Sequence, residues 1–401
     1  MKKTVRWKVF SLLLVTVIAG YYLFPTLSGR SSLPSLLPPL LPRTERLNLG
    51  LDLQGGMHLV LEVVTEKAVE NTVDRLITEL RRETEKEKIT VEQMTREGID
   101  RIRIRLQAKE GMDGLRRILK SYSNLQQSGG ADPAELSLSL TSSEIKRIQE
   151  STVRQSLETI RNRVDQFGVS EPHIIQEGNR RIIVQLPGIK EPQRAINLIG
   201  KTALLEFKMV AEDANIAEAV AGKVPEGDEL LYIRRAEEGE KVSKTPLVVQ
   251  KRAILTGDLL TSAQVQIEGQ TNKPVVSIAF DREGTRLFGE ATAANVGRRM
   301  AIVLDDTIYS APVIREKIPG GKAQISGSFT MEEARDLAIV LRAGALPAPV
   351  NIISNLTVGP SLGLDSIEKG MRAAILGGVL VIAFMAVYYR LSGVIANFAL
   401  L

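Results

Sequence analysis

The chain has 401 residues, of which 44% are hydrophobic and 25% charged, enough for two or more compact domains besides membrane segments. Its 52 Lys and Arg residues nearly balance 47 Asp and Glu residues, and no basic tract appears, which argues against nucleic-acid binding. Cysteine is absent, so disulfides, thiolate metal sites and cysteine nucleophiles are excluded. His58 and His173 are the only histidines, and we predict neither a metal site nor a cofactor.

The N-terminal segment is typical of a membrane anchor. Residues 9–24 carry no charge, follow four basic residues among the first eight, and end at Pro25. We therefore predict a transmembrane helix over residues 9–24, with residues 1–8 in the cytoplasm by the positive-inside rule. A cleaved signal peptide would share the basic start and the apolar core, but no clear small-x-small cleavage site follows.

A second apolar run lies between Arg372 and Arg390 and predicts another transmembrane helix over residues 371–389. It would return the chain to the cytoplasm, which places residues 25–372 on the outer face of the membrane. A third apolar run, residues 393–401, is too short to finish a crossing. We interpret the chain as the N-terminal part of a longer polytopic membrane protein.

Residues 25–42, rich in Pro and Leu, predict an extended stalk. Residues 47–63 then alternate apolar and polar on both sides of Gly55 and Gly56, which predicts a strand, a sharp turn and a second strand. The residues just before the turn, Leu49-Gly50-Leu51-Asp52, recur as Leu362-Gly363-Leu364-Asp365 before the second span. Asp52 and Asp365 are candidates for proton-linked movement near the membrane. A carboxylate accepting backbone hydrogen bonds in a turn is the simpler interpretation.

The next part of the chain predicts an α+β domain. Its patterns indicate a helix at 65–88, strands at 101–107 and 135–140, a capped helix at 141–168, a hairpin of 169–176 and 180–186, a helix at 192–200 and a strand at 202–209. From residue 135 onward this order is β-α-β-β-α-β, the ferredoxin-like pattern. We predict a base over residues 43–210.

Composition changes near Ala211, where residues 211–244 become acidic and weakly periodic and predict a mobile connection. Strands at 254–267, 274–281, 299–304, 307–314 and 322–328, with a helix after Asp281, then predict a second α+β unit. Thr330 and Glu333 form a capping box for a further helix that stops at Gly344. We predict a head over residues 211–329, with residues 330–360 rejoining the base. Val210 and Thr330 are the hinge candidates.

No pattern of an enzyme stands out. Adjacent acids such as Asp305-Asp306 are typical of solvated turns, and the Gly-Gly pairs lack the Lys-Ser/Thr of a phosphate loop. No serine sits in a Gly-x-Ser-x-Gly elbow. We predict a protein that is not an enzyme.

Five motifs, taken together, resemble the SecD family of bacterial protein-export membrane subunits. They are Leu49-Gly50-Leu51-Asp52-Leu53-Gln54-Gly55-Gly56, Ile160 to Val169 (IRNRVDQFGV), Val184 to Gly188 (VQLPG), Leu255 to Asp258 (LTGD) and Gly359 to Ile367 (GPSLGLDSI). Residues 64–127 match no motif of the family.

The resemblance implies a multi-pass subunit of the inner membrane in the RND superfamily, with a large periplasmic domain made of a ferredoxin-like base and an inserted α+β head. It implies SecF and the SecYEG channel as partners, with YajC as a further one, and unfolded preproteins as substrate, moved with the proton motive force. The head would hold the emerging polypeptide, and Ile267 and Phe280 are our candidate contacts. The proton-path residues of the family lie in helices beyond Leu401.

Two other classes of function stay open at this point. An RND-like exporter of small molecules or lipids would have a large apolar pocket in the head, whereas a shallow groove would suit an extended peptide. A membrane-anchored scaffold module would need neither.

Overall fold

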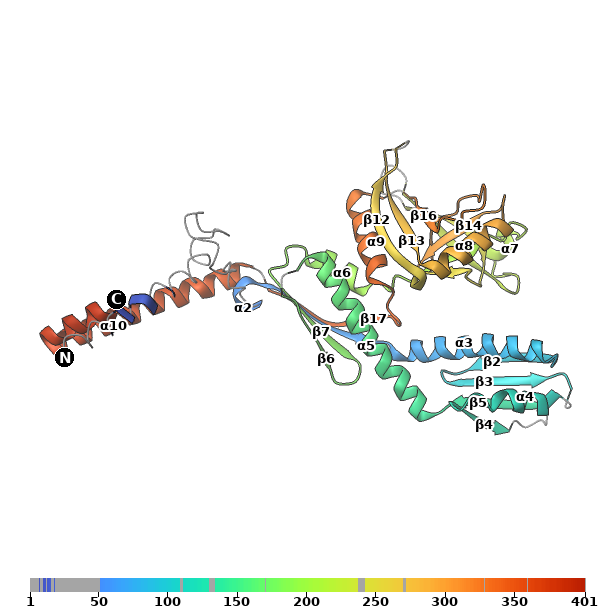
Figure 1. Ribbon diagram of the computed structural model, residues 1–401, viewed down its shortest axis with the longest axis horizontal. Helices are drawn as coiled ribbons and strands as arrows, with labels where there is room; N and C mark the ends of the chain where they lie inside the picture. Colours follow the sequence, from blue (N-terminus) through green and yellow to red (C-terminus); the bar gives the residue numbers. More distant parts are fainter. Residues whose placement is uncertain are drawn as a thin grey trace. The chain divides into compact units, whose positions relative to one another are not determined.

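The computed structural model describes residues 51–400, with gaps at 109–110, 130–133, 170, 237–241, 270–271, 328 and 359, and scattered residues between 7 and 18 (Figure 1). The predicted helix at 9–24 lies mostly, and the predicted stalk at 25–42 entirely, outside the described residues. Contacts divide the chain into two compact units, Met1–Gly55 with Gly359–Leu401, and Gly56–Val358.

A four-stranded antiparallel sheet, here called the base sheet, forms one part of the larger unit. Its strand order is β17 (Val350–Val358), β1 (Gly56–Val63), β7 (Arg181–Pro187) and β6 (His173–Glu177). Helices α5 (Ser142–Phe167) and α6 (Pro192–Gly200) complete it. In chain order these elements read β1-α5-β6-β7-α6-β17, so the base is ferredoxin-like in both sequence order and strand order.

The prediction of a ferredoxin-like unit was right, but it assigned the wrong segments as the first and last strands of the β-α-β-β-α-β order. The strand at 135–140 is β5 (Glu135–Leu140), and the strand at 202–209 is β8 (Leu205–Met209); each belongs to another sheet. Their places in the base are taken by β1 and β17, which are almost 300 residues apart in the chain and pair from Gly56 with Val358 to Val63 with Val350. The prediction assumed that strands next to each other in the sequence belong to one sheet. Two insertions in the chain separate the first and last strands of the base sheet from its other elements.

The first insertion, residues 65–140, separates β1 from α5. It consists of α3 (Thr65–Lys86), β2 (Val91–Glu97), β3 (Arg101–Leu106), α4 (Met112–Leu119), β4 (Leu125–Gly129) and β5. Its antiparallel sheet has the order β2-β3-β5-β4. Strands β3 and β5 bury alternate residues, as their sequences predict, and their apolar side chains share one core with the base sheet.

The second insertion, residues 205–343, separates α6 from β17. Its six-stranded sheet has the order β10 (Val242–Gln250), β9 (Asp228–Ala236), β15 (Thr307–Ser310), β14 (Met300–Leu304), β8 and β11 (Leu255–Thr256). A three-stranded sheet has the order β12 (Leu260–Ile267), β13 (Pro274–Phe280) and β16 (Lys322–Ile325). Helices α7 (Ile216–Val220), α8 (Arg282–Ala294) and α9 (Met331–Ala343) and the 3-10 turn Gly257–Leu259 complete it.

Two expectations for this region are corrected. Residues 211–244 do not form a mobile connection throughout, because the described part contains α7 and the paired strands β9 and β10. Helix α9 was expected to rejoin the base; instead its buried side chains, Ala334, Leu337 and Leu341 among them, share a core with Phe207, Phe280 and Phe288 of the second insertion. Only β17 returns to the base sheet.

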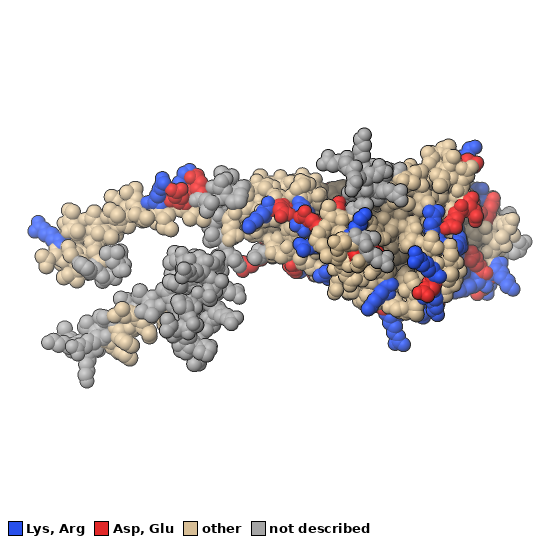
Figure 2. Space-filling model, turned by 90° about the horizontal axis from the view of Figure 1, so that it is seen from above, with Lys and Arg blue, Asp and Glu red and all other residues tan. Residues whose placement is uncertain are grey.

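The smaller unit contains α2 (Leu51–Gln54) and α10 (Pro360–Leu400). Residues 51–54 are helical, so this part of the predicted strand is wrong. Helix α10 breaks at Arg390, where φ is 49°, and Asn397 then donates to the Ile382 carbonyl at 2.9 Å, so the end of the chain folds back along the helix. Among the described residues, Asp365–Asn397 is long and apolar enough to cross a membrane, with a mean hydropathy of 2.1. Figure 2 shows an uncharged surface along most of α10.

Side-chain caps start several helices where the sequence predicts them. The hydroxyls of Thr141 and Thr330 accept from the amides of Glu144 and Glu333, and the Asp281 carboxylate accepts from the Gly284 amide. Helix α5 ends at Gly168, whose φ of 83° lies in the left-handed region.

Replacing Gly168 with Ala should destabilise the chain by about 1 kcal/mol, because an L-residue at this φ is strained even though no atom lies within 4 Å of the new Cβ. Gly200→Ala is the matched control: its Cβ also meets open space, but its φ is not in the left-handed region. Urea unfolding of the purified chain in detergent measures both. Equal stability of the two variants would contradict the strain argument.

Candidate functional site

The Gly55-Gly56 turn leads into β1, one of the two inner strands of the base sheet. Both glycines are buried and have positive φ, 71° and 139°. Gly56 pairs with Val358 on one neighbouring strand and with Pro187 on the other, and its positive φ means that an L side chain there would be strained. The motif therefore sets where β1 begins between β17 and β7.

The two repeated Leu-Gly-Leu-Asp segments flank this region of the chain. Helix α2, which holds Leu51 to Gln54, contacts α10, which holds Leu362 to Asp365. The Asp365 carboxylate accepts from Lys369 Nζ at 2.7 Å, one helical turn away. Leu49 and Gly50 lie outside the described residues, as do the side chains of Asp52 and Leu53.

Two segments of chain, here called the crossing segments, join the second insertion to the base: residues 201–204 and 344–349. The Leu346 amide donates to the Thr202 carbonyl at 2.8 Å, which binds the two segments together. The Asp305 carboxylate, from the β14–β15 turn, accepts from the amides of Ala203 and Leu204, both at 3.0 Å. One acid of the Asp305-Asp306 pair thus holds a crossing segment rather than only facing water.

Arg163 of α5 is buried at this joint, with 1% of its surface exposed. Its guanidinium donates to five main-chain carbonyls, those of Leu198, Ile199, Lys201, Thr202 and Gly344. These carbonyls end α6 and α9 or belong to the crossing segments, so one cation neutralises the negative ends of two helices. Burial lowers the pKa of Arg163 to about 10, which still leaves it charged at neutral pH.

A second arginine links the base to the second insertion on a more exposed side. Arg194 of α6 donates from Nε and Nη2 to Asp336 Oδ1 of α9, at 3.0 and 2.7 Å, and pairs with Glu332 at 2.7 Å. Its guanidinium also lies 5.4 Å from the ring centre of Phe167. The hydrogen bond with Asp336 contributes most to raising the pKa of Arg194. About a quarter of this side chain is exposed, so water can compete for the contact.

The predicted hinge residues do not lie at this joint. Val210 is fully buried and forms a β-bridge with Val249 inside the second insertion, and Thr330 caps α9. The prediction placed the boundary between base and head after β8, where the sequence becomes more polar. In the structure β8 already belongs to the sheet of the second insertion, so the chain leaves the base before β8.

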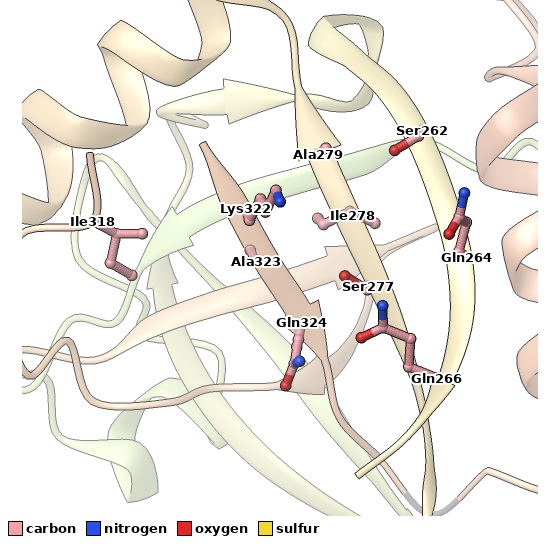
Figure 3. Close-up of a pocket in the computed structure, with 10 residues that line it drawn as sticks. All are labelled: Ser262, Gln264, Gln266, Ser277, Ile278, Ala279, Ile318, Lys322, Ala323 and Gln324. Atoms are coloured by element: carbon pink, nitrogen blue, oxygen red, sulfur yellow. The ribbon is translucent and has the colours of Figure 1, made fainter. Parts of the chain in front are cut away.

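The three-stranded sheet of the second insertion has an open polar face over a hollow of about 600 Å³ (Figure 3). The hollow is lined by Ser262, Gln264, Gln266, Ser277, Ile278, Ala279, Ile318, Lys322, Ala323 and Gln324. Of the described residues, no carboxylate lines it, and Lys322 is the one charged residue there. Amide and hydroxyl groups of this kind both donate and accept hydrogen bonds, without favouring one charge.

A second hollow, of about 290 Å³, lies against the same sheet and is mostly apolar. Phe207, Phe288, Met300 and Ile302 belong to its lining, and it shares Ile318, Ala323 and Gln324 with the first hollow.

The two predicted contact residues differ in accessibility. Ile267 is 58% exposed at the end of β12, although it lines neither hollow. Phe280 is only 6% exposed and packs against Phe207 and Phe288, with ring centres 5.5 and 5.1 Å apart. The Phe280 ring is part of the hydrophobic core, so it is not available as a surface contact.

Sequence reasoning missed the charged residues that hold this region together. Arg163 lies three residues after Ile160 on the buried stripe of α5, and a cation at that position is the signal that could have identified it. Lys208 is likewise buried in β8, between Glu206 and Glu229 at 2.7 Å each. Burial lowers its pKa, but the two carboxylates raise it more, so the net shift is upward. No group of acids and histidines in the described residues is arranged to hold a metal.

Three family models match the chain. They are "SecD/SecF GG Motif" at residues 44–66, "Protein translocase subunit SecDF, P1 domain, N-terminal" at residues 153–212, and "SecDF, P1 head subdomain" at residues 229–348. The first includes the Gly55-Gly56 turn, the second includes Arg163, and the third includes both hollows except Phe207.

Curated relatives match across the chain. Protein translocase subunit SecD of Calditerrivibrio nitroreducens is 48% identical over 406 aligned positions, which cover all of this chain and 75% of the relative. SecD of Syntrophobacter fumaroxidans is 45% identical, covering 98% of this chain and 75% of the relative.

A crystal structure of SecDF in a "Super-membrane-facing form" matches with 28% identity and a TM-score of 0.47, covering 95% of this chain and 39% of that one. The curated relatives show the family of this chain, because their sequence identity is high and the alignments extend over most of both chains. The chain belongs to the SecD family of protein translocase subunits.

Proposed function

We propose that the chain acts in the Sec machinery, with SecF and the SecYEG channel, and helps unfolded preproteins cross the bacterial inner membrane with the proton motive force. Family membership supports protein export, and the apolar helix α10 supports a membrane location. The observation that carries the proposal is the second insertion: a hollowed unit that joins a ferredoxin-like base through two short crossing segments. YajC is a further candidate partner.

In this proposal the N-terminus is cytoplasmic and residues 25–372 lie in the periplasm. The basic residues before residue 9 support this orientation. The chain covers about three quarters of its curated relatives. We propose that proton passage belongs to the part of the family's proteins that this chain does not cover. Asp52 and Asp365 remain candidates for linking that passage to the base.

The second insertion would hold the emerging polypeptide. Its hollow has a floor of Gln and Ser side chains, which suits a substrate without a fixed sequence. The head in this proposal is residues 205–343, and Ile267 remains a candidate contact on its surface. A small-molecule or lipid exporter is the second candidate, favoured by the apolar hollow of about 290 Å³. The larger hollow is polar over about half of its lining, through Gln, Ser and Lys side chains, which favours the polypeptide.

The head would turn about the crossing segments. Arg163 holds them from inside the core, whereas the Arg194–Asp336 contact is partly exposed and can break and reform. Buried Arg163 then acts as the pivot, and Arg194 as a latch between two orientations.

A photo-crosslinker in place of Gln264 should form adducts with a preprotein arrested during export, because Gln264 faces the hollow. Glu92, exposed on β2 of the first insertion, is the control position and should give few. Adducts are detected by gel shift in vesicles that contain the whole machinery. Adducts at Glu92 but none at Gln264 would contradict substrate holding by the head.

Replacing Arg163 with Leu should destabilise the chain by about 3 kcal/mol or more, because five buried or partly buried carbonyls lose the guanidinium. In the described part of the chain only that of Thr202 keeps a main-chain donor, the Leu346 amide. Arg161→Leu removes a neighbouring cation that is 45% exposed and should cost less than about 0.5 kcal/mol. Denaturant unfolding of the purified chains compares them. Similar midpoints for both variants would remove Arg163 from its role at the joint.

Gly56→Val should reduce preprotein export more than it reduces the amount of chain in the membrane, since it strains the start of β1, directly after the Leu49-Gly50-Leu51-Asp52 segment in the chain. Gly178→Val, also at positive φ but in the open β6–β7 turn, is the control. Pulse-labelled maturation of a preprotein and immunoblotting of the chain give the two readouts. Equal loss of export and protein would assign Gly56 a purely structural role.

A further inference from the structure

Strand β16 (Lys322–Ile325) is an edge strand. It pairs with β13 on one side, in the register Val276 with Ile325 and Ala279 with Lys322. Among the described residues, no strand pairs with its other side. Open strand edges carry unpaired main-chain donors and acceptors, which can pair with another chain.

The register decides which main-chain groups are free. The Phe280 amide donates to the Gly321 carbonyl at 2.9 Å, so Phe280 and Gly321 form a hydrogen-bonded pair. In an antiparallel ladder such pairs alternate with pairs whose main-chain groups point outward. Ala323 therefore bonds to β13, whereas the N–H and C=O groups of Lys322 and Gln324 point away from the sheet.

The space beside this edge is hollow on both faces of the strand. The larger hollow lies over the face that carries Gln324 and Ser277, and the smaller, mostly apolar hollow is lined by Phe288 and Met300 on the core side of the strand. Both hollows reach Ile318, which Figure 3 shows on the side of β16 away from β13. A strand added at the edge would place successive side chains in the two hollows in turn, because side chains alternate along a strand.

We propose that an extended segment of an unfolded polypeptide pairs with the outer edge of β16 and extends the three-stranded sheet by one strand. The inference rests on the proposed function and specifies how the head holds its substrate. Main-chain pairing does not depend on the sequence of the bound segment, and an export machinery must accept many sequences. The two hollows leave room for the side chains that alternate between the two faces of the added strand. Four free main-chain groups at strand spacing fit a peptide backbone better than a compact small molecule.

Gln324→Pro tests the pairing. Of the main-chain groups, proline removes only the Gln324 N–H, which points outward, so the bonds to β13 remain. Proline is accepted on an edge strand in this orientation. Gln324→Ala is the matched control, because it removes the side chain and keeps the N–H. The probe is an eight-residue fluorescent peptide of alternating Val and Ser, measured by anisotropy on the chain in detergent, with a version N-methylated at alternate amides as the second control.

We expect Gln324→Pro and the N-methylated peptide each to weaken binding about tenfold, and Gln324→Ala to change it less than about threefold. Thermal unfolding of both variants checks that the fold persists. Edge pairing is overturned if the Gln324→Pro and Gln324→Ala variants bind the peptide equally well, or if N-methylation of the peptide has no effect on binding. It is also overturned if the peptide does not bind the unaltered chain. Crosslinks from Gln264 to a preprotein would still stand in those cases, so failure of edge pairing is distinguishable from failure of substrate holding.

Discussion

Five main-chain carbonyls that converge on the guanidinium of Arg163 decide how the larger unit is joined. Without a buried donor, the ends of α6 and α9 would bring unpaired carbonyls into an apolar environment, at a cost of about 1–3 kcal/mol each. Arg163 satisfies them from α5 of the base, so the crossing segments are bound to the same helix. Asp305 completes the joint from the other side by accepting the amides of Ala203 and Leu204.

Because the two crossing segments lie side by side, a long insertion between them leaves the strand pairing of the base sheet intact. The base sheet closes when β17 pairs with β1, and that pairing needs residues 201–204 and 344–349 to lie together. The hydrogen bond between Leu346 and Thr202 brings them together. The inserted residues can then form their own core around Phe207, Phe280 and Phe288. Their open sheet edge at β16 stays free for a function that the base does not need.

Local patterns predicted most elements well. Helices α5, α6 and α9 begin and end near their predicted residues, because Thr141, Pro192, Thr330 and Gly168 act over one turn of chain. The burial of Phe280, and the place where the chain passes between the base and the second insertion, were not predicted, for the opposite reason. Whether Phe280 faces solvent depends on Phe207 and Phe288, which come from other elements. Arg163 was missed because its partners lie 35 to 181 residues away.

The sequence by itself determined the α+β class, the apolar run at α10, the helix caps and the family motifs, since each depends on residues close together in the chain. Tertiary structure alone decided which strands form the ferredoxin-like sheet, where the second insertion joins the base, and which main-chain groups of β16 stay free. Strand pairing and burial depend on segments far apart in sequence, and a single sequence carries no direct record of which segments meet.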